Sequence, residues 1–495
     1  MITLSMIVKN EEKYLKECLE SVCRIIDEIV LVDTGSTDNT KKIAEEYGAK
    51  IFDFKWNNDF ASARNYALSK SSGDWILYLD ADERLDASSI QELKKLTSEK
   101  SQKGFYCRIL NVDEINNRPS VMSYVRLFAN SPDIKFEGKV HEQIENSLYK
   151  NGYELKNSRV EIIHVGYNLS KEELKEKAKR NIEILSVEYK ENPTGYFAFQ
   201  IGQTLHKLDR EEEAVEYFLK ALEDGSLRNE YKSTACRSIA IYHAGNSDFI
   251  NAEKFINDSI KYDPQQPLSL LSYAKIYFKL GRIKEAIYSV KEALKFNRAY
   301  VSGKKVSSQN ILIDQKVIIY FGLLMSLPGD NVHNVNYFLD ELKAGSVSDE
   351  YKFYSELIKK KTIPSNIGDI LKFIDDESIE LLFDSISRVN DKSSVFQFLS
   401  TLEKKFKNSS YYYSKYGLLL YENSELDNAE LMLKKSLQIN PHEYSSVFYL
   451  ISVYIKQNRI DKILNTINEH RHNFISKPQL VSKLEELEQK LKSIV

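Results

Sequence analysis

The chain has 495 residues, enough for two to four domains with well-buried cores. Its 69 lysines and arginines nearly balance 72 acidic residues, and the net charge of −3 argues against nucleic acid as a partner. Four scattered cysteines are too few for a disulfide framework, so we expect a reducing, cytoplasmic compartment. The sequence shows no basic leader and no long apolar run, so we expect neither a signal peptide nor an integral membrane segment.

The first 100 residues alternate between strand-like and helix-like patterns. Short apolar runs predict strands, and apolar residues at helical spacing predict the helices between them. We expect strands at 4–8, 29–32, 50–54 and 75–79, and helices at 15–22, 37–47 and 58–70. Strands and helices that alternate through short connections predict an α/β domain with a mostly parallel sheet.

Residues 104–166 change in character. Three further strands are expected there, at 105–112, 123–128 and 160–165, and from residue 170 onward the chain is almost entirely helical in pattern. We therefore predict that the α/β domain ends at residue 167 and that an all-α region follows.

The helical region contains internal repeats, in which small residues recur where two helices would approach closely. These residues are Gly202 and Ala214 in one unit, Ala240 and Ala252 in the next, Ala274 and Ala286 in a third, and Gly417 and Ala429 far downstream. The units resemble tetratricopeptide repeats (TPRs) over residues 168–300 and 406–495, which predicts a helical solenoid. Residues 301–405 give no clean repeat and are expected to form an irregular helical segment.

The most informative segment is the apolar run 75–79, which is followed directly by Asp80 and Asp82. A buried parallel strand carries such residues to the carboxyl edge of its sheet, where open α/β folds bind ligands. Two nearby carboxylates there suit a divalent cation that holds a diphosphate. The alternative is a pair of solvated turn carboxylates that cap the next helix. No glycine-rich phosphate loop is present, so metal and side chains would have to offset the charge of a diphosphate.

Residues 1–167 resemble the family 2 glycosyltransferases, which have a GT-A fold. The segments that carry the resemblance are 5–12, 32–38, 56–60 with 64–65, 80–82, 136–142 and 163–167. Within the family, the chain is most similar to bacterial enzymes with a C-terminal repeat domain. These include the S-glycosyltransferases of glycosylated bacteriocins and the flagellin glycosyltransferases.

The resemblance implies roles for individual residues. It assigns the metal, Mn²⁺ or Mg²⁺, to Asp82 and His164, and the general base that activates the acceptor to Glu142. It assigns the nucleotide sugar to Val8, Asn10, Glu11, Asp33, Arg64, Asp80 and Ala81. Arg126 is added to this set because it interrupts the apolar strand pattern at 125–128. Two residues depart from the family pattern: Lys9 stands where an aromatic residue is common, and Thr34 replaces a second acid, so the uracil contacts are left open.

Several of these residues have plainer interpretations. Glu11 suits the first turn of any helix, because an acid there favours the helix dipole. Arg64 could equally be an ordinary surface arginine, and His141 and His164 could be buried, hydrogen-bonded rings.

The expected activity is inverting, metal-dependent transfer from a UDP-sugar to a polypeptide. Ser/Thr of flagellin is the first choice of acceptor, and Cys or Ser of a bacteriocin precursor is the second. The alternatives are a lipid-linked envelope glycan as acceptor, or a non-catalytic TPR scaffold. A homodimer formed through the helical repeats is a further expectation.

Overall fold

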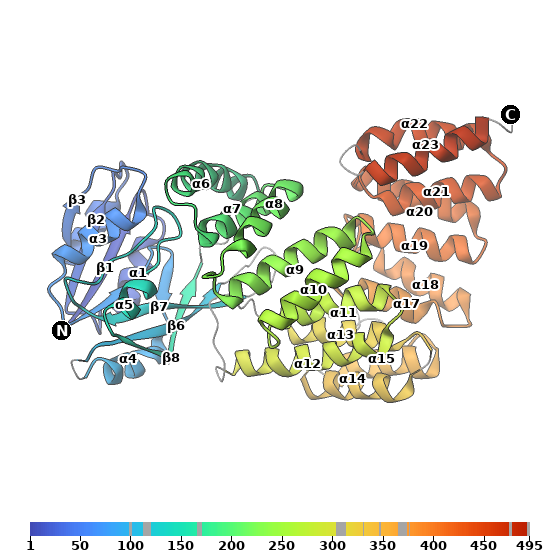
Figure 1. Ribbon diagram of the computed structural model, residues 1–495. Helices are drawn as coiled ribbons and strands as arrows, with labels where there is room; N and C mark the ends of the chain where they lie inside the picture. Colours follow the sequence, from blue (N-terminus) through green and yellow to red (C-terminus); the bar gives the residue numbers. More distant parts are fainter. Residues whose placement is uncertain are drawn as a thin grey trace. The chain divides into compact units, whose positions relative to one another are not determined.

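The computed structural model describes residues 1–98, 101–111, 120–165, 171–302, 313–329, 331–345, 348–364, 374–375, 377–474 and 478–492. The chain divides into two compact units, Met1–Asp314 and Gln315–Val495. The first unit holds the sheet and its associated helices together with a first set of helix pairs, and the second is helical throughout its described residues (Figure 1).

Within the described residues, eight strands form one sheet in the order β3-β2-β1-β4-β7-β6-β8-β5. Their bounds are β1 Ile2–Val8, β2 Glu28–Asp33, β3 Lys50–Asp53, β4 Trp75–Tyr78, β5 Glu83–Leu85, β6 Lys103–Asn111, β7 Ser120–Ala129 and β8 Glu154–His164. The strands β3, β2, β1 and β4 pair in parallel, as the alternating pattern predicts. The strand β7 then runs antiparallel to β4 and to β6, which makes the whole sheet mixed.

Helices cover both faces of the parallel half. The sheet-associated helices are α1 Leu15–Val22, α2 Thr40–Glu46, α3 Phe60–Lys70, α4 Ile90–Leu96 and α5 Glu145–Lys150, and a short 3-10 turn, η1, spans Ala87–Ser89. Side chains alternate along β2, so that Leu31 packs in the core with α1 and α2, while Val30 and Val32 pack with Ala67 of α3. This alternation follows from the two-residue period of a strand. As a result, α3 packs against the strands whose carboxyl ends carry the candidate site.

The elements β5, α4 and α5 were not predicted. The strand β5 is only three residues long and contains one acidic, one basic and one apolar residue, so it has no apolar run to mark it. It exists because Glu83, Arg84 and Leu85 pair with the end of β8. This pairing brings the segment after β4 against His164, the last residue of β8.

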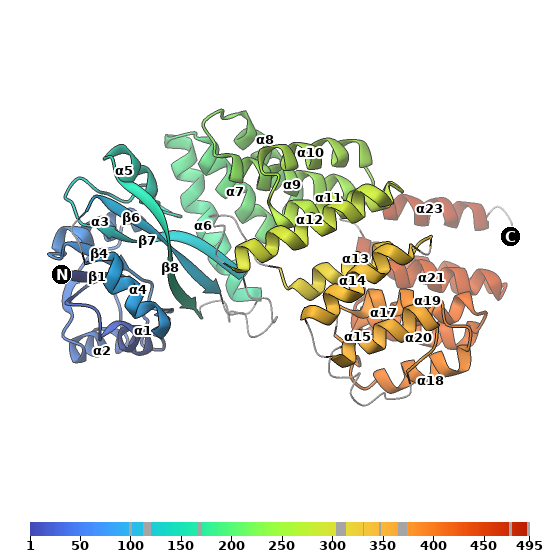
Figure 2. The same cartoon turned by 90° about the horizontal axis from the view of Figure 1, so that it is seen from below.

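The helices of the first unit's repeat region pack as successive pairs (Figure 2). They are α6 Lys171–Glu191, α7 Gly195–Lys207, α8 Glu211–Glu223, α9 Asn229–Gly245, α10 Phe249–Tyr262, α11 Pro267–Lys279 and α12 Ile283–Val301. A Cβ atom on Gly202 would lie only 2.8 Å from the ring of Phe218, so glycine is required where α7 crosses α8. The close approach expected at Gly202 is therefore present.

The second unit contains further helix pairs. Its elements are α13 Gln315–Ser326, α14 Val332–Gly345, α15 Ser348–Ser355, η2 Glu356–Lys360, α17 Ile379–Ile386, α18 Lys392–Leu402, α19 Ser410–Glu422, α20 Leu426–Ile439, α21 Tyr444–Lys456, α22 Ile460–His470, η3 Arg471–Phe474 and α23 Pro478–Lys492. Gly417 packs against Leu433 as Gly202 does against Phe218, and Gly322 packs against Phe338 at the same sequence spacing. The segment 301–405, which gives no clean repeat in sequence, thus contains one helix pair of the repeat type.

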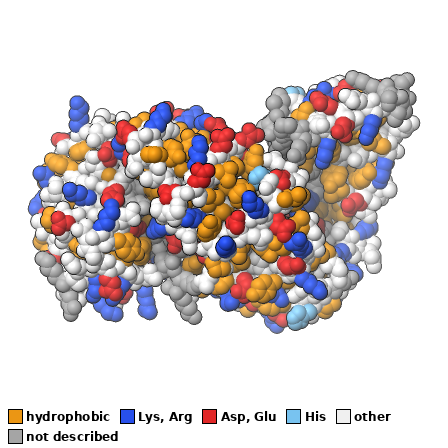
Figure 3. All heavy atoms as spheres, viewed as in Figure 1, with side chains coloured by type: hydrophobic (Ala, Val, Ile, Leu, Met, Phe, Trp, Pro, Cys, Tyr) orange, Lys and Arg blue, Asp and Glu red, His pale blue; other side chains and the backbone are white. Residues whose placement is uncertain are grey.

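The predicted fold class, an α/β domain followed by an all-α helical region, is confirmed. The boundaries at 167, 300 and 405 remain predictions, and Gly166, Tyr167 and Gly303 lie outside the described residues. No helix in the described part of the chain is both long and apolar enough to cross a membrane. Basic and acidic side chains are interspersed on the face shown in Figure 3.

Candidate active site

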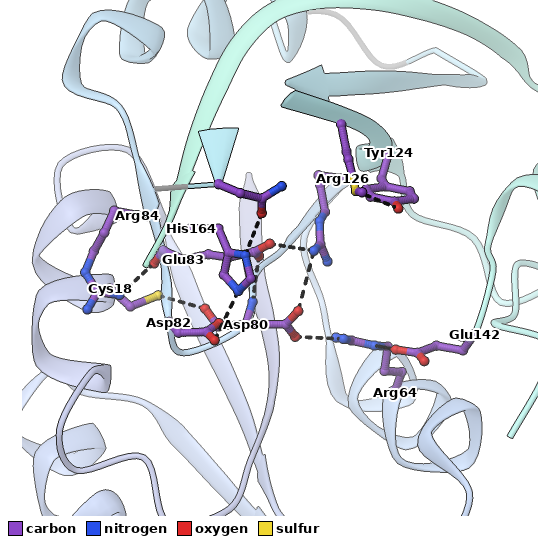
Figure 4. Close-up of polar contacts among 12 residues, drawn as sticks. Cys18, Arg64, Asp80, Asp82, Glu83, Arg84, Tyr124, Arg126, Glu142 and His164 are labelled. Atoms are coloured by element: carbon purple, nitrogen blue, oxygen red, sulfur yellow. Dashed lines mark hydrogen bonds and ion pairs between the residues drawn. The ribbon is translucent and has the colours of Figure 1, made fainter. Parts of the chain in front are cut away.

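The candidate site lies where β4 ends. Leu79 is fully buried after the strand, and the chain then turns tightly. The backbone N–H of Glu83 donates to the carbonyl oxygen of Asp80 (3.0 Å), and the N–H of Asp80 donates to the Glu83 carboxylate (2.9 Å). Because of this turn, the side chains of Asp80 and Asp82 point in different directions and contact two different groups of residues (Figure 4).

Asp80 lies between two arginines. Nη2 of Arg64, from α3, donates to Oδ1 at 2.8 Å, and Nη2 of Arg126, from β7, lies 3.5 Å from Oδ2. Both guanidinium groups also lie over the ring of Tyr78. Burial alone would raise the pKa of Asp80, but the charges of Arg64 and Arg126 outweigh it and hold that pKa well below its usual range. Asp80 is therefore a carboxylate.

Arg64 also reaches Glu142. Its Nε donates to Oε1 of Glu142 at 2.5 Å, and the Glu142 side chain is only 14% exposed. Asp80, which is predicted to bind the nucleotide sugar, and Glu142, the predicted base, are thus joined through one guanidinium group. Because Arg64 is buried in this network, the interpretation of Arg64 as a surface arginine is wrong.

Glu83 was missed by the sequence reading. Its side chain is 2% exposed and accepts a hydrogen bond from Nη2 of Arg126 at 2.6 Å. Burial raises the pKa of Glu83, although the charge of Arg126 counteracts it. In the sequence, the one indication of a role for Glu83 is its place beside Asp80 and Asp82 in the acidic segment after β4.

Asp82 pairs with His164. Nε2 of His164 lies 3.1 Å from Oδ2 of Asp82, and Nδ1 lies 2.7 Å from Oδ1 of Asn111, the last residue of β6. Asn111 and His164 are register partners in β6 and β8, so the sheet itself aligns them. Burial alone would lower the pKa of His164, but its hydrogen bond to Asp82 raises that pKa.

This pair fits a divalent metal ion. If Nδ1 donates to the amide oxygen of Asn111, Nε2 is the nitrogen that faces Asp82, where it can carry a proton or bind a cation. Asp82 and His164 would offer one carboxylate oxygen and one imidazole nitrogen to a Mn²⁺ or Mg²⁺ ion. No group of three or more acidic, histidine or cysteine side chains is placed to hold a metal in the residues that the structure describes.

Other residues that are predicted to bind the nucleotide sugar line the ends of β1 and β2. The carbonyl oxygen of Val8 accepts hydrogen bonds from Thr34, and Asn10, at a left-handed φ of 56°, accepts one from the N–H of Thr37 (2.8 Å). The carboxylate of Asp33 is 1% exposed and is already bound by backbone N–H groups of its own turn. The hydrogen bonds of these residues shape the loops at the ends of β1 and β2.

Glu11 and Ala81 lie nearer to the carboxylates. Burial first, and then the charges of Asp82 and Asp80, raise the pKa of Glu11 to about 7, which places the three acids within electrostatic range of one another. Ala81 is buried, and its carbonyl oxygen accepts a hydrogen bond from Nη1 of Arg84 at 2.8 Å. The ligand roles of all these residues remain predictions.

Family models and curated relatives agree with this architecture. Residues 3–152 match the model described as Glycosyl transferase family 2, and residues 197–223 and 269–300 match Tetratricopeptide repeat. A TPR repeat-containing protein of Synechococcus elongatus is 34% identical over 211 residues, which is 41% of this chain and 52% of that protein. The SPbeta prophage-derived glycosyltransferase SunS of Bacillus subtilis is 33% identical over 237 residues, which is 47% of this chain and 54% of that protein.

The chain spans about half the length of these curated relatives. Among solved structures, Staphylococcus aureus TarS aligns with a TM-score of 0.29 at 16% identity, over 59% of this chain and 54% of that chain. These values are too low to support an inference about function. The family models and the curated relatives show that the chain combines a domain of glycosyltransferase family 2 with tetratricopeptide repeats.

Proposed function

We propose that the protein is a metal-dependent, inverting glycosyltransferase that moves a sugar from a UDP-sugar to a polypeptide acceptor. The observation that carries this proposal is that one strand end holds two groups of side chains: the Asp82–His164 pair, and Asp80, whose partner Arg64 also binds the carboxylate of Glu142. The first group suits a metal, and Glu142 in the second suits a base.

On the donor side, Asp82 and His164 would hold Mn²⁺ or Mg²⁺. Such an ion, when bound, offsets the charge of a diphosphate leaving group. Arg64 and Arg126 fix Asp80 as an ionised carboxylate, which suits hydrogen bonds from the ribose hydroxyls or from metal-bound water. Glu11 adds a third acid to this side, in keeping with a cationic ligand there.

On the acceptor side, Glu142 would act as the base. Arg64 engages Oε1, which leaves Oε2 to take the proton from the acceptor hydroxyl or thiol. The acceptor atom bonds to the anomeric carbon while the bond from that carbon to the phosphate oxygen breaks, and the electron pair leaves with UDP. A single displacement of this kind inverts the anomeric configuration.

A polypeptide acceptor is supported by the repeats. Stacked helix pairs form extended surfaces that commonly bind peptide segments. The first pairs belong to the same compact unit as the sheet, so such a surface would be close to the site. Flagellin Ser/Thr is the first choice of acceptor, and Cys or Ser of a bacteriocin precursor is the second.

The full-length protein can be tested with a panel of UDP-sugars and Mn²⁺, first alone and then with purified flagellin or a cysteine-containing precursor peptide. We expect UDP release that EDTA abolishes and a sugar-sized gain in the intact mass of one polypeptide. UDP release without any polypeptide product would contradict the proposed polypeptide acceptor but not the glycosyltransferase activity. No UDP release with any UDP-sugar would contradict the glycosyltransferase activity itself.

A further inference from the structure

The loop that carries Glu142 is closed on itself and tied to α3. Glu137 and Gln143 exchange two backbone hydrogen bonds of 2.9 Å, so residues 137–143 form a small closed loop. The side chain of Asn65, next to Arg64 on α3, makes two hydrogen bonds to the backbone of Phe136. The root of the loop is therefore held by the sheet domain.

The tip of the same loop is held by the first helical repeat. Val140 is 3% exposed and packs in one hydrophobic cluster with Phe197, Leu205 and Ala214 of α7 and α8. Nζ of Lys139 lies 2.7 Å from a carboxylate oxygen of Glu191, the last residue of α6. The loop is thus part of the repeat's core as well as part of the candidate active site.

A tyrosine of the repeat contacts the residues on both sides of Glu142. The hydroxyl group of Tyr196, on α7, donates to the carbonyl oxygen of His141 (3.1 Å) and accepts from Nε2 of Gln143 (2.9 Å). Nε2 of Gln200 supplies a third hydrogen bond at 2.8 Å. One donor and two acceptor positions of the phenol are therefore all engaged.

The backbone at this point needs support. His141 has a φ of 56°, in the left-handed region that a non-glycine residue rarely adopts, and Gly138 has a φ of 98°. A left-handed φ is unfavourable for a non-glycine residue such as His141 and persists only where its surroundings enforce it. The carbonyl oxygen of His141 that follows this strained φ is the group that Tyr196 binds. Arg64 then binds the next side chain, that of Glu142.

We infer that Tyr196 is a positioning residue for catalysis, and that the first repeat is a structural part of the active site as well as a candidate surface for the acceptor. Tyr196 acts through His141 and Gln143 to hold the carboxylate of Glu142 at its working distance from Arg64 and the donor. This inference rests on the proposed role of Glu142 as the base. It gives the repeat a role in turnover that does not depend on which acceptor binds.

The test is Tyr196→Phe in the full-length protein, with UDP release from a UDP-sugar and Mn²⁺ as the assay. Loss of the hydroxyl should lower kcat about tenfold per folded molecule, the size expected for one polar contact that orients a base, and should leave KM for the UDP-sugar unchanged. The matched control is Tyr277→Phe, since the hydroxyl of Tyr277, on α11, is also hydrogen-bonded to a neighbouring element, at Glu253 and Asn257 of α10. This control should keep the kcat of the unchanged protein.

A double-mutant cycle separates positioning from folding. If Tyr196 acts through Glu142, Tyr196→Phe should cause no further loss in a Glu142→Gln background. The same fold-loss in both backgrounds, or an unchanged kcat in the single variant, would overturn the inference while Glu142 stays the base. A fully active Glu142→Gln variant would overturn the proposed function as well. Should Tyr196→Phe fail to fold, Gln143→Met removes the Gln143–Tyr196 contact, together with the bond from Gln143 to Tyr231, and should also lower kcat without a further loss in the Glu142→Gln background.

Discussion

The two edges of the parallel sheet use carboxylates in opposite ways. At the amino edge, Glu28 begins β2, has a side chain 5% exposed, and accepts hydrogen bonds from Thr3, Lys50 and Ser72. Burial alone would raise the pKa of Glu28, but these bonds lower it to about 2. At the carboxyl edge, the side chains of Asp80 and Asp82 are 40% and 25% exposed.

This difference in carboxylate exposure indicates that the two edges have different roles. A carboxylate that is buried and fully bonded stabilises the fold, whereas carboxylates that keep oxygens open to solvent can bind a ligand. The carboxyl edge also gathers Glu11, Asp80, Asp82, Glu83 and Glu142 against two arginines and one histidine. Substitutions at the carboxyl edge should therefore affect turnover, and those at the amino edge should affect stability alone.

The largest effect is expected from Glu142→Gln. Turnover of the UDP-sugar should fall by a factor on the order of 10³, because the acceptor loses its base, while the affinity for UDP stays unchanged in calorimetry. The control is Glu137→Gln in the same loop, whose carboxylate is 45% exposed and pairs with Lys150. Loss of UDP affinity in step with turnover would instead assign Glu142 to the donor site.

His164→Gln should have an intermediate effect. Loss of an imidazole ligand should weaken Mn²⁺ binding by at least the roughly 10- to 100-fold that loss of a residue supporting a ligand costs, measured as the Mn²⁺ concentration that gives half-maximal UDP release. His243→Gln is a matched control, because His243 pairs with Asp248 at 3.0 Å and is similarly exposed, but lies on α9. An unchanged Mn²⁺ requirement in His164→Gln would show that His164 is only a hydrogen-bonded ring.

Glu28→Gln should have the smallest effect on catalysis and a clear effect on stability. We expect the free energy of unfolding of the sheet-bearing unit to fall by about 2 kcal/mol at pH 7, with turnover per folded molecule unchanged. The folded-state pKa of about 2 lies below the ordinary 4.5, so this stabilisation is complete above about pH 4.5 and is lost as the pH falls toward 2.

Urea unfolding at pH 7 and pH 3 measures the Glu28 effect. The difference in the free energy of unfolding between the unchanged protein and Glu28→Gln should be smaller at pH 3 than at pH 7. Glu154→Gln, at the exposed start of β8, should leave stability unchanged at both values. A difference that is equal at the two pH values would mean that the ionised carboxylate is not what stabilises the amino edge.

Much of the sheet could be predicted because its strands are apolar runs. The parallel strands were found within a few residues of their observed ends, and Asp80 and Asp82 fell at the edge where such strands place polar residues. The close helix crossings at Gly202 and Gly417 were also predictable, since small residues recur at fixed offsets.

The contacts that build the site could not be predicted. Arg64 and Glu142 are 78 residues apart, and no local pattern indicates that they meet. The strand β5 is too short and too polar to show an apolar run, yet its pairing with β8 brings Asp82 to His164. No sequence pattern sets Tyr196 apart among the 31 tyrosines of the chain, because its role depends on contacts with a loop of the sheet domain.

If the carboxyl edge binds UDP together with a divalent metal held by Asp82, calorimetric titration of UDP should detect that binding. In the presence of Mn²⁺, the full-length protein should bind UDP, and either EDTA or Asp82→Ala should abolish the binding, while thermal unfolding shows that the variant stays folded. The exposed Asp133→Ala should behave as the unchanged protein does. Equal UDP affinity in Mn²⁺ and in EDTA, or full affinity in Asp82→Ala, would contradict the account.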